Sequence, residues 1–97
     1  MKKGYWLVRA DVTDPEKFKN YAEKTPLALA KFGGKFLVRA GDSTLVEGDT
    51  RSRNTVIEFP SYQSAIDCWE SQEYQSAKKL RVDGGHLDIV IIEGVGE

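Results

Sequence analysis

The segment at residues 86–93 constrains the fold more than any other, because it is strand-like and apolar on both sides. It reads His-Leu-Asp-Ile-Val-Ile-Ile-Glu, and successive side chains of a β-strand point to opposite faces of a sheet. Residues 5–12 form a similar strand, in which Tyr5 and Leu7 lie opposite Trp6 and Val8. A sheet built from such strands needs cover on both faces.

Two more strands and two helical regions complete the expected order. Strands are expected over residues 35–40 and 54–59, where β-branched and aromatic residues alternate with polar ones. The first helix begins at Asp14-Pro15 and ends at Gly33-Gly34. Pro26 lies inside this helix and predicts either a kink or a restart capped by Thr25. Serines at positions 61 and 71 predict two further helical stretches.

The resulting order of strand, helix, strand, strand, helix, strand is typical of the ferredoxin-like α+β fold, a four-stranded antiparallel sheet with its helices on one face. At 97 residues the chain is expected to form one domain, residues 1–97. Because the helices cover only one face, we expect a second copy to cover the other, which gives a homodimeric α+β barrel. The alternative is that the second face is simply exposed, since much protein surface is apolar.

Charge and composition exclude several classes of function. The 14 basic and 15 acidic residues are dispersed and leave a net charge of −1, which argues against nucleic-acid and anionic-lipid partners. The apolar stretch after Lys2-Lys3 is interrupted at Arg9 and Asp11, too soon for a secretory signal, so the expected location is the cytoplasm. No stretch approaches the roughly 18 apolar residues of a membrane helix. Cys68 is the only cysteine and His86 the only histidine, so one chain can form neither a disulfide nor a two-histidine metal site. We expect no metal and no cofactor.

Charged side chains also fall on the face that the helices leave open. Strict alternation places Arg9 and Asp11 there, puts Arg39 beside Leu37, and allows Glu58 to point the same way. Charges inside a dimer are costly unless they are paired or used. Two interpretations stay open: pairs of arginine with carboxylate that fix strand register or dimer orientation, or a pocket for a small acidic or carbonyl-containing ligand.

The connection at residues 41–53 is thirteen residues long, which is longer than most hairpin loops. Glu47 and Arg53 lie within it. If it folds over the sheet, Glu47 would accept a proton while Arg39 or Arg53 holds a carboxylate or a developing enolate. The length of this connection and its charges motivate that hypothesis.

Several stretches together resemble the family called domain of unknown function 1330. They are residues 4–6 (Gly-Tyr-Trp), 11–15 (Asp-Val-Thr-Asp-Pro), 33–39 (Gly-Gly-Lys-Phe-Leu-Val-Arg), 47–48 (Glu-Gly), 56–60 (Val-Ile-Glu-Phe-Pro) and 71–74. The resemblance spans nearly the whole chain and implies a dimeric α+β barrel. It places the chain in a broader group that includes cofactor-free monooxygenases and muconolactone isomerase-like proteins, although the family itself has no established reaction.

The resemblance also implies functional roles for Arg39, Glu47, Arg53, Glu58, Trp69 and Tyr74. None of these forms a complete catalytic signature, and Trp69 and Tyr74 are first of all expected in the core. His86 lies outside the family motifs and is more simply the first residue of a strand. The candidate catalytic residues are Glu47, Arg39 and His86. The candidate ligand-binding residues are Arg9, Tyr21, Arg53, Glu58, Trp69 and Tyr74.

Two functions remain open. The first is a small cofactor-independent enzyme that transfers a proton or oxygenates a small aromatic or keto compound in a pocket by the sheet. The second is a non-catalytic barrel that binds a small molecule, for example under stress. The two differ in one respect: an enzyme needs a pocket group whose pKa is displaced toward neutrality, whereas a binding barrel needs only fixed charge and apolar walls.

Overall fold

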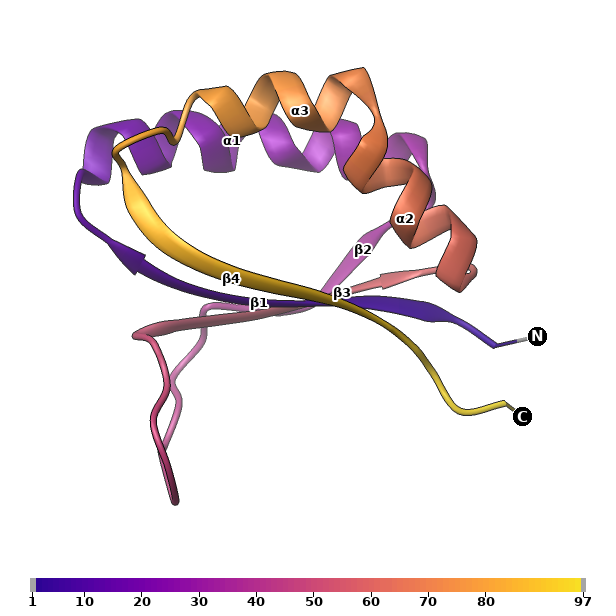
Figure 1. Ribbon diagram of the computed structural model, residues 1–97, viewed down its shortest axis with the longest axis horizontal. Coiled ribbons are helices and arrows are strands. Elements are labelled where there is room, and N and C mark those ends of the chain that lie inside the picture. Colours follow the sequence, from indigo (N-terminus) through magenta and orange to yellow (C-terminus); the bar gives the residue numbers. More distant parts are fainter. Residues whose placement is uncertain (1, 97) are drawn as a thin grey trace.

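The computed structural model describes residues 2–96. Its elements are β1 (Gly4–Val12), α1 (Pro15–Lys31), β2 (Lys35–Arg39), β3 (Arg53–Phe59), α2 (Tyr62–Glu70), α3 (Gln72–Lys79) and β4 (Gly85–Glu93). The strands form one antiparallel sheet in the order β2-β3-β1-β4. The three helices lie on one face of this sheet and leave the other face bare (Figure 1). The predicted ferredoxin-like α+β fold is therefore confirmed.

Each helix begins where a side chain can replace the missing backbone acceptor. The Asp14 carboxylate accepts hydrogen bonds from the amides of Glu16 and Lys17 at 3.1 and 3.2 Å, with a proline at the first helical position. Ser61 caps α2, and Ser71 caps α3 directly after α2 ends. The two predicted serine caps are thus confirmed.

Helix α1 continues through Pro26 without a restart. Thr25 is not a cap, because it lies inside the helix and its hydroxyl donates to the Ala22 carbonyl at 3.3 Å. The prediction that the helix restarts with Thr25 as its cap is therefore wrong. Because proline has no amide hydrogen, the helix instead lacks the usual hydrogen bond between residue 26 and the Ala22 carbonyl.

Strand β2 contains a bulge between Phe36 and Val38. Phe36 pairs with Ile57 and Arg39 pairs with Thr55, so both side chains face the helices. The Arg39 guanidinium lies 4.2 Å from the centre of the Phe36 ring. The expectation that Arg39 lies with Leu37 on the bare face was therefore wrong, because a bulge adds one residue and reverses the alternation beyond it.

The core lies between the sheet and the helices and is centred on Trp6, which is 1% exposed. Its ring contacts those of Phe59 and Tyr74, with centroids 5.3 and 4.9 Å apart. Cys68 is also fully buried, and burial raises the pKa of its thiol to about 12. This residue therefore behaves as a small core side chain, as expected, and carries no thiolate at neutral pH.

The bare face of the sheet is apolar in its middle. Leu7 of β1 lies between Val56 and Val90 of the neighbouring strands, and both Val90 and Ile92 of β4 are about half exposed, at 50 and 48%. Such a face matches the two-sided apolar pattern of the sequence. Among residues 2–96, no helix is long and apolar enough to cross a membrane.

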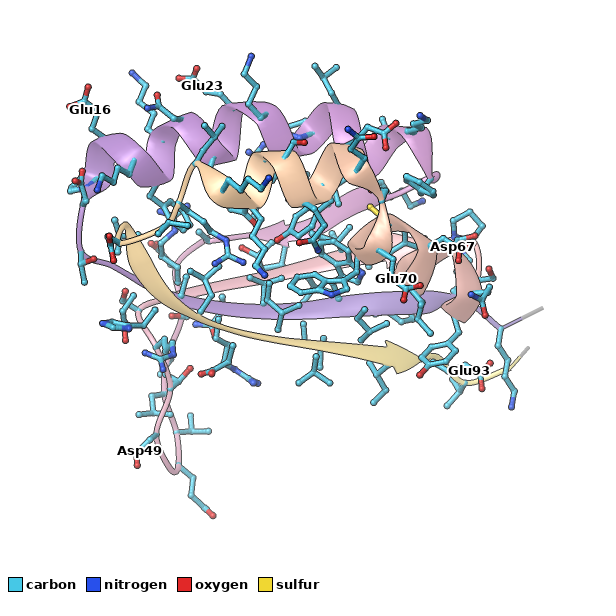
Figure 2. The ribbon with its side chains drawn as sticks, turned by 45° about the horizontal axis from the view of Figure 1, so that its top comes forward. Glu16, Glu23, Asp49, Asp67, Glu70 and Glu93 are labelled. Carbon is cyan, nitrogen blue, oxygen red and sulfur yellow. The ribbon has the colours of Figure 1, made fainter. Side chains whose placement is uncertain are left out.

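Residues 40–52 form an arm that extends from the sheet on the side opposite the helices (Figure 1). The arm contains no strand, and Asp49 lies at its far end (Figure 2). Arg51 fixes its base by donating to Asp11 and Asp88 at 2.8 and 2.7 Å. Hydrogen bonds from the Ser52 amide and from Arg51 hold the pKa of Asp11 below its usual value. The arm is thus anchored at its base and exposed at its tip.

Candidate functional site

A cavity lies between α1 and the sheet, within a single chain. Phe18, Tyr21 and Thr25 line it from α1, Trp6 from the sheet, and Tyr74 from α3. The space open to the centre of a water molecule is about 50 Å³, and the empty space including the open mouth is about 540 Å³. A few small groups fit inside as the side chains stand.

Two arginines provide all the formal charge of the cavity wall. Arg39 is exposed and Arg53 half-buried, so both lie toward the mouth. Among the described residues neither has a carboxylate within 4.0 Å, and no acidic residue lines the cavity. Figure 2 shows Glu16 and Glu23 of α1 pointing outward, away from it. The wall therefore carries uncompensated positive charge, which favours an anionic ligand.

Pro26 helps to hold Arg39 at this position. Because proline has no amide hydrogen, the carbonyl of Ala22 lacks its usual donor from four residues later. Arg39 donates to that carbonyl at 3.1 Å. Pro26 therefore leaves a carbonyl without its backbone donor, and this carbonyl holds the Arg39 guanidinium. In the sequence, the signal for this role is a proline four residues after Ala22, which lines the cavity.

Arg53 lies over an aromatic ring in the same wall. Its guanidinium is 5.1 Å from the centre of the Phe18 ring, which is within cation–π distance. Phe18 packs in turn against Tyr21, with ring centroids 5.5 Å apart. Phe18 and Tyr21 recur at helical spacing in the sequence, but this periodicity gives no sign that an arginine from the sheet covers the Phe18 ring.

Two phenols lie at the buried end of the cavity. The hydroxyls of Tyr21 and Tyr74 are 2.8 Å apart and hydrogen-bonded, and the two residues are 8 and 0% exposed. Burial, together with the neighbouring Tyr74, raises the pKa of Tyr21 above its usual value, although Arg81 opposes this rise. Tyr21 therefore keeps its proton at neutral pH and can act as a hydrogen-bond donor but not as a base.

Four of the nine predicted site residues line this one cavity: Arg39, Arg53, Tyr21 and Tyr74. Trp69 lies behind it, with its ring 5.2 Å from that of Tyr74, and packs against the core. It therefore supports a wall of the cavity without lining it.

The other four predicted residues lie elsewhere. Glu58 faces the bare side of the sheet and accepts hydrogen bonds from Lys3 and Tyr5, both at 3.2 Å. Burial opposes its charged form, but Lys3 and Lys35 outweigh this effect and lower the pKa of Glu58. Glu58 is thus one member of an ion-pair cluster, but its partners are lysines and not the arginines that the first interpretation of these charges expects.

Glu47 and Arg9 line a second, shallow hollow of about 300 Å³ between the arm and the bare face. His86 is exposed at the start of β4, paired with Asp11. Within one chain the structure does not bring Glu47 to Arg39 or to the other arginine of the cavity, because the arm extends from the opposite side of the sheet (Figure 1). Among residues 2–96, no group of three potential ligand side chains is placed to hold a metal ion.

Comparison with known families gives one match. The model of a family described as domain of unknown function (DUF1330) matches residues 3–95. No curated protein matches the chain.

Solved structures share the fold at low sequence identity. A protein of unknown function from Rhodopseudomonas palustris is 13% identical, with a TM-score of 0.76 over 99% of this chain and 85% of its own. SnoaB, a cofactor-independent oxygenase from Streptomyces nogalater, is 11% identical, with a TM-score of 0.64 over 100% of this chain and 97% of its own. A protein from Nitrosomonas europaea, described as a candidate antibiotic biosynthesis monooxygenase, is 17% identical, with a TM-score of 0.58 over 96% of this chain and 99% of its own. At these identities the likeness shows the fold alone.

Proposed function

The chain belongs to the family of domain of unknown function 1330, and from this premise we propose that it binds a small anionic aromatic or keto compound between α1 and the sheet and acts on it without a cofactor. One observation carries the proposal. Arg39 and Arg53 bring positive charge without carboxylate partners to an otherwise apolar and aromatic cavity. An apolar wall with a few polar groups is typical of small-molecule sites.

The reaction that suits this cavity is oxygenation or proton transfer on a compound that forms its own anion. A CH₂ group beside a carbonyl loses a proton to water, and the resulting enolate carbon bonds to O₂. The proton returns to the peroxide oxygen, and loss of water leaves a second carbonyl, so that CH₂ and O₂ become C=O and H₂O. Arg39 and Arg53 favour this course because they hold the anionic group of the substrate and keep the cavity positive while the enolate forms. The fold shared with a cofactor-independent oxygenase supports the choice.

The second candidate function is binding without catalysis. It is favoured by the state of the titratable groups, since the two arginines are permanently charged and the pKa of Tyr21 is displaced away from neutrality. No carboxylate or histidine lines the cavity in the described part of the chain. A site of this composition holds an anion firmly and offers no base of its own.

We expect charged ligands to bind at least about tenfold more tightly than neutral ones of the same shape. Calorimetric titration of benzoate and 1-hydroxy-2-naphthoate, each against its amide, measures this ratio. Arg39→Met and Arg53→Met should each weaken binding of the acids about tenfold. Lys19→Met is the matched control, because Lys19 is an exposed cation of α1 with its side chain 76% exposed.

Equal binding of acids and amides, or acid binding that survives both arginine variants, would contradict the proposed site. Oxygen uptake and exchange of deuterium from the ligand, measured on any acid that binds, then separate the two functions. Turnover above the rate in buffer supports the enzyme. Tight binding with neither reaction supports the non-catalytic function.

We further propose that a second copy of the chain covers the bare face of the sheet. Val90 lies in the middle of this face, paired with Leu7, and both Val90 and Ile92 are about half exposed. In light scattering, the wild-type chain should have twice its mass of 10.9 kDa. Val90→Lys should raise the dissociation constant of the dimer at least about tenfold, because a cation would then be buried without a partner.

Leu27→Lys is the control for this measurement, since Leu27 is 76% exposed on α1, on the helical side. It should leave the mass unchanged. A wild-type chain that is monomeric at micromolar concentration, or a dimer that is indifferent to Val90→Lys, would show that this face is not the interface.

A further inference from the structure

The buried end of the cavity holds one hydroxyl proton for which the described residues provide no acceptor. The hydroxyls of Tyr21 and Tyr74 share one hydrogen bond of 2.8 Å, in which either can be the donor. Two hydroxyls carry two protons, so one proton remains after this bond is made. Among the described residues, no second acceptor lies within hydrogen-bond distance of either hydroxyl.

A third donor lies beside this pair. The Arg81 guanidinium is 5.1 Å from the centre of the Tyr21 ring. Its Nε is buried and has no hydrogen-bond partner among the described residues. Arg81 does not line the cavity, but its positive charge polarises the neighbouring phenol and makes Tyr21 a stronger donor.

The position of the pair relative to the two arginines fixes how a ligand can lie. Tyr21 and Tyr74 are 8 and 0% exposed, whereas Arg39 is exposed and Arg53 half-buried in the same wall. A ligand whose anionic group contacts the arginines therefore directs its other end toward the phenols. The Phe18 ring lies between these two ends, since it contacts both Arg53 and Tyr21, and it suits a flat apolar body.

We infer that the Tyr21–Tyr74 hydroxyl pair donates a hydrogen bond to a carbonyl or phenolic oxygen at the end of the ligand opposite its anionic group. The inference rests on the proposed function and specifies its substrate class as aromatic or keto acids with a second acceptor oxygen. In the oxygenation described above, this oxygen is the carbonyl oxygen on which the enolate charge develops. A donor held at that point stabilises the charge as it forms.

Two ligands of nearly equal shape test the inference. 4-Acetylbenzoate carries an acceptor oxygen opposite its carboxylate, whereas 4-isopropylbenzoate has a methyl group in its place. We expect the wild-type chain to bind the acetyl compound about tenfold more tightly in calorimetric titration, which corresponds to one good hydrogen bond.

The double variant Tyr21→Phe/Tyr74→Phe removes both hydroxyls and keeps both rings. Because it replaces a buried hydrogen-bonded pair by two apolar groups of the same shape, its stability should change little. The tenfold preference should disappear, while the affinity for 4-isopropylbenzoate stays at the wild-type value. If the double variant fails to fold, the single variants carry the test, and the one that removes the donating hydroxyl lowers the preference.

The outcomes separate this inference from the proposed function. A wild-type preference near one, or a preference that survives the loss of both hydroxyls, overturns the role of the tyrosine pair. In that case the proposed site still stands if binding of both acids depends on Arg39 and Arg53. If neither acid binds the wild-type chain, both proposals fail. Equal weakening of the two ligands in the double variant shows a structural role only and also overturns the inference.

Discussion

Trp6→Ala is expected to lower the free energy of unfolding by roughly 3–5 kcal/mol. Trp6 is 1% exposed and packs against Phe59 and Tyr74 in the centre of the core. Its indole nitrogen also donates to the carbonyl of Ala65 in α2 at 2.9 Å. The substitution would leave a large cavity and remove a buried donor, and both effects add to the loss. Urea denaturation followed by circular dichroism, at one fixed protein concentration, measures the change.

Trp69→Ala is the matched comparison. Trp69 lies in the same aromatic cluster, with its ring 6.0 Å from that of Trp6, but it is only partly buried. Trp69→Ala should therefore lower the free energy of unfolding clearly less than Trp6→Ala does. Equal losses at the two positions would show that the core is not centred on the first strand.

Gly4→Ala should destabilise the chain by about 3 kcal/mol or more, although it adds a single methyl group. A Cβ atom at Gly4 would lie 2.5 Å from the carbonyl oxygen of Ser61 and 2.7 Å from the Cα of Tyr62. Both atoms belong to the backbone at the start of α2, so relief requires that the helix move away from the sheet. The midpoint of thermal or urea unfolding reports the effect.

Gly41→Ala provides the control, because a Cβ atom there meets nothing within 4 Å. It should change the midpoint only slightly. A Gly4→Ala chain that is as stable as wild type would mean that α2 is free to shift away from β1 at little cost.

The local signals in the sequence were sufficient for the order of the elements. The caps at Asp14, Ser61 and Ser71 act through hydrogen bonds to amides only two or three residues away. Because such contacts are contained in a few neighbouring residues, a short stretch of sequence determines them. The same holds for alternation within β1, where no irregularity interrupts the pattern.

A short stretch of sequence could not predict that Arg39 faces the helices. That orientation depends on a bulge in β2, and the bulge is fixed by pairing with β3, more than ten residues along the chain. The partners of Glu58 likewise come from distant parts of the chain, since Lys3 and Lys35 meet it only once the sheet has formed. Alternation predicts the face of each side chain only as far as the first irregularity in a strand. Beyond it, the direction of a side chain depends on how the strand pairs with its neighbour.

The cavity between α1 and the sheet was not predicted, for a related reason. The sequence combines apolar and charged residues on the bare face, and a pocket there was one of the two interpretations of those charges. The structure shows Arg53, Tyr21 and Tyr74 around a space on the helical side. Tyr21 recurs at helical spacing with Phe18 and Leu29 in the sequence, yet such periodicity cannot distinguish a residue that fills the core from one that borders a cavity.

The sheet order β2-β3-β1-β4 also determines when the protein can fold during its synthesis. β1 occupies an interior position and pairs only with β3 and β4, so it emerges from the ribosome long before either partner. At typical rates of translation, residues 13–84, which separate β1 from β4, take roughly 4–14 s to make. Throughout that interval an apolar strand has an unpaired edge and is open to aggregation or to chaperones. Strand β4 both completes the sheet and supplies Val90, so the association proposed for the bare face requires that translation has already passed this strand.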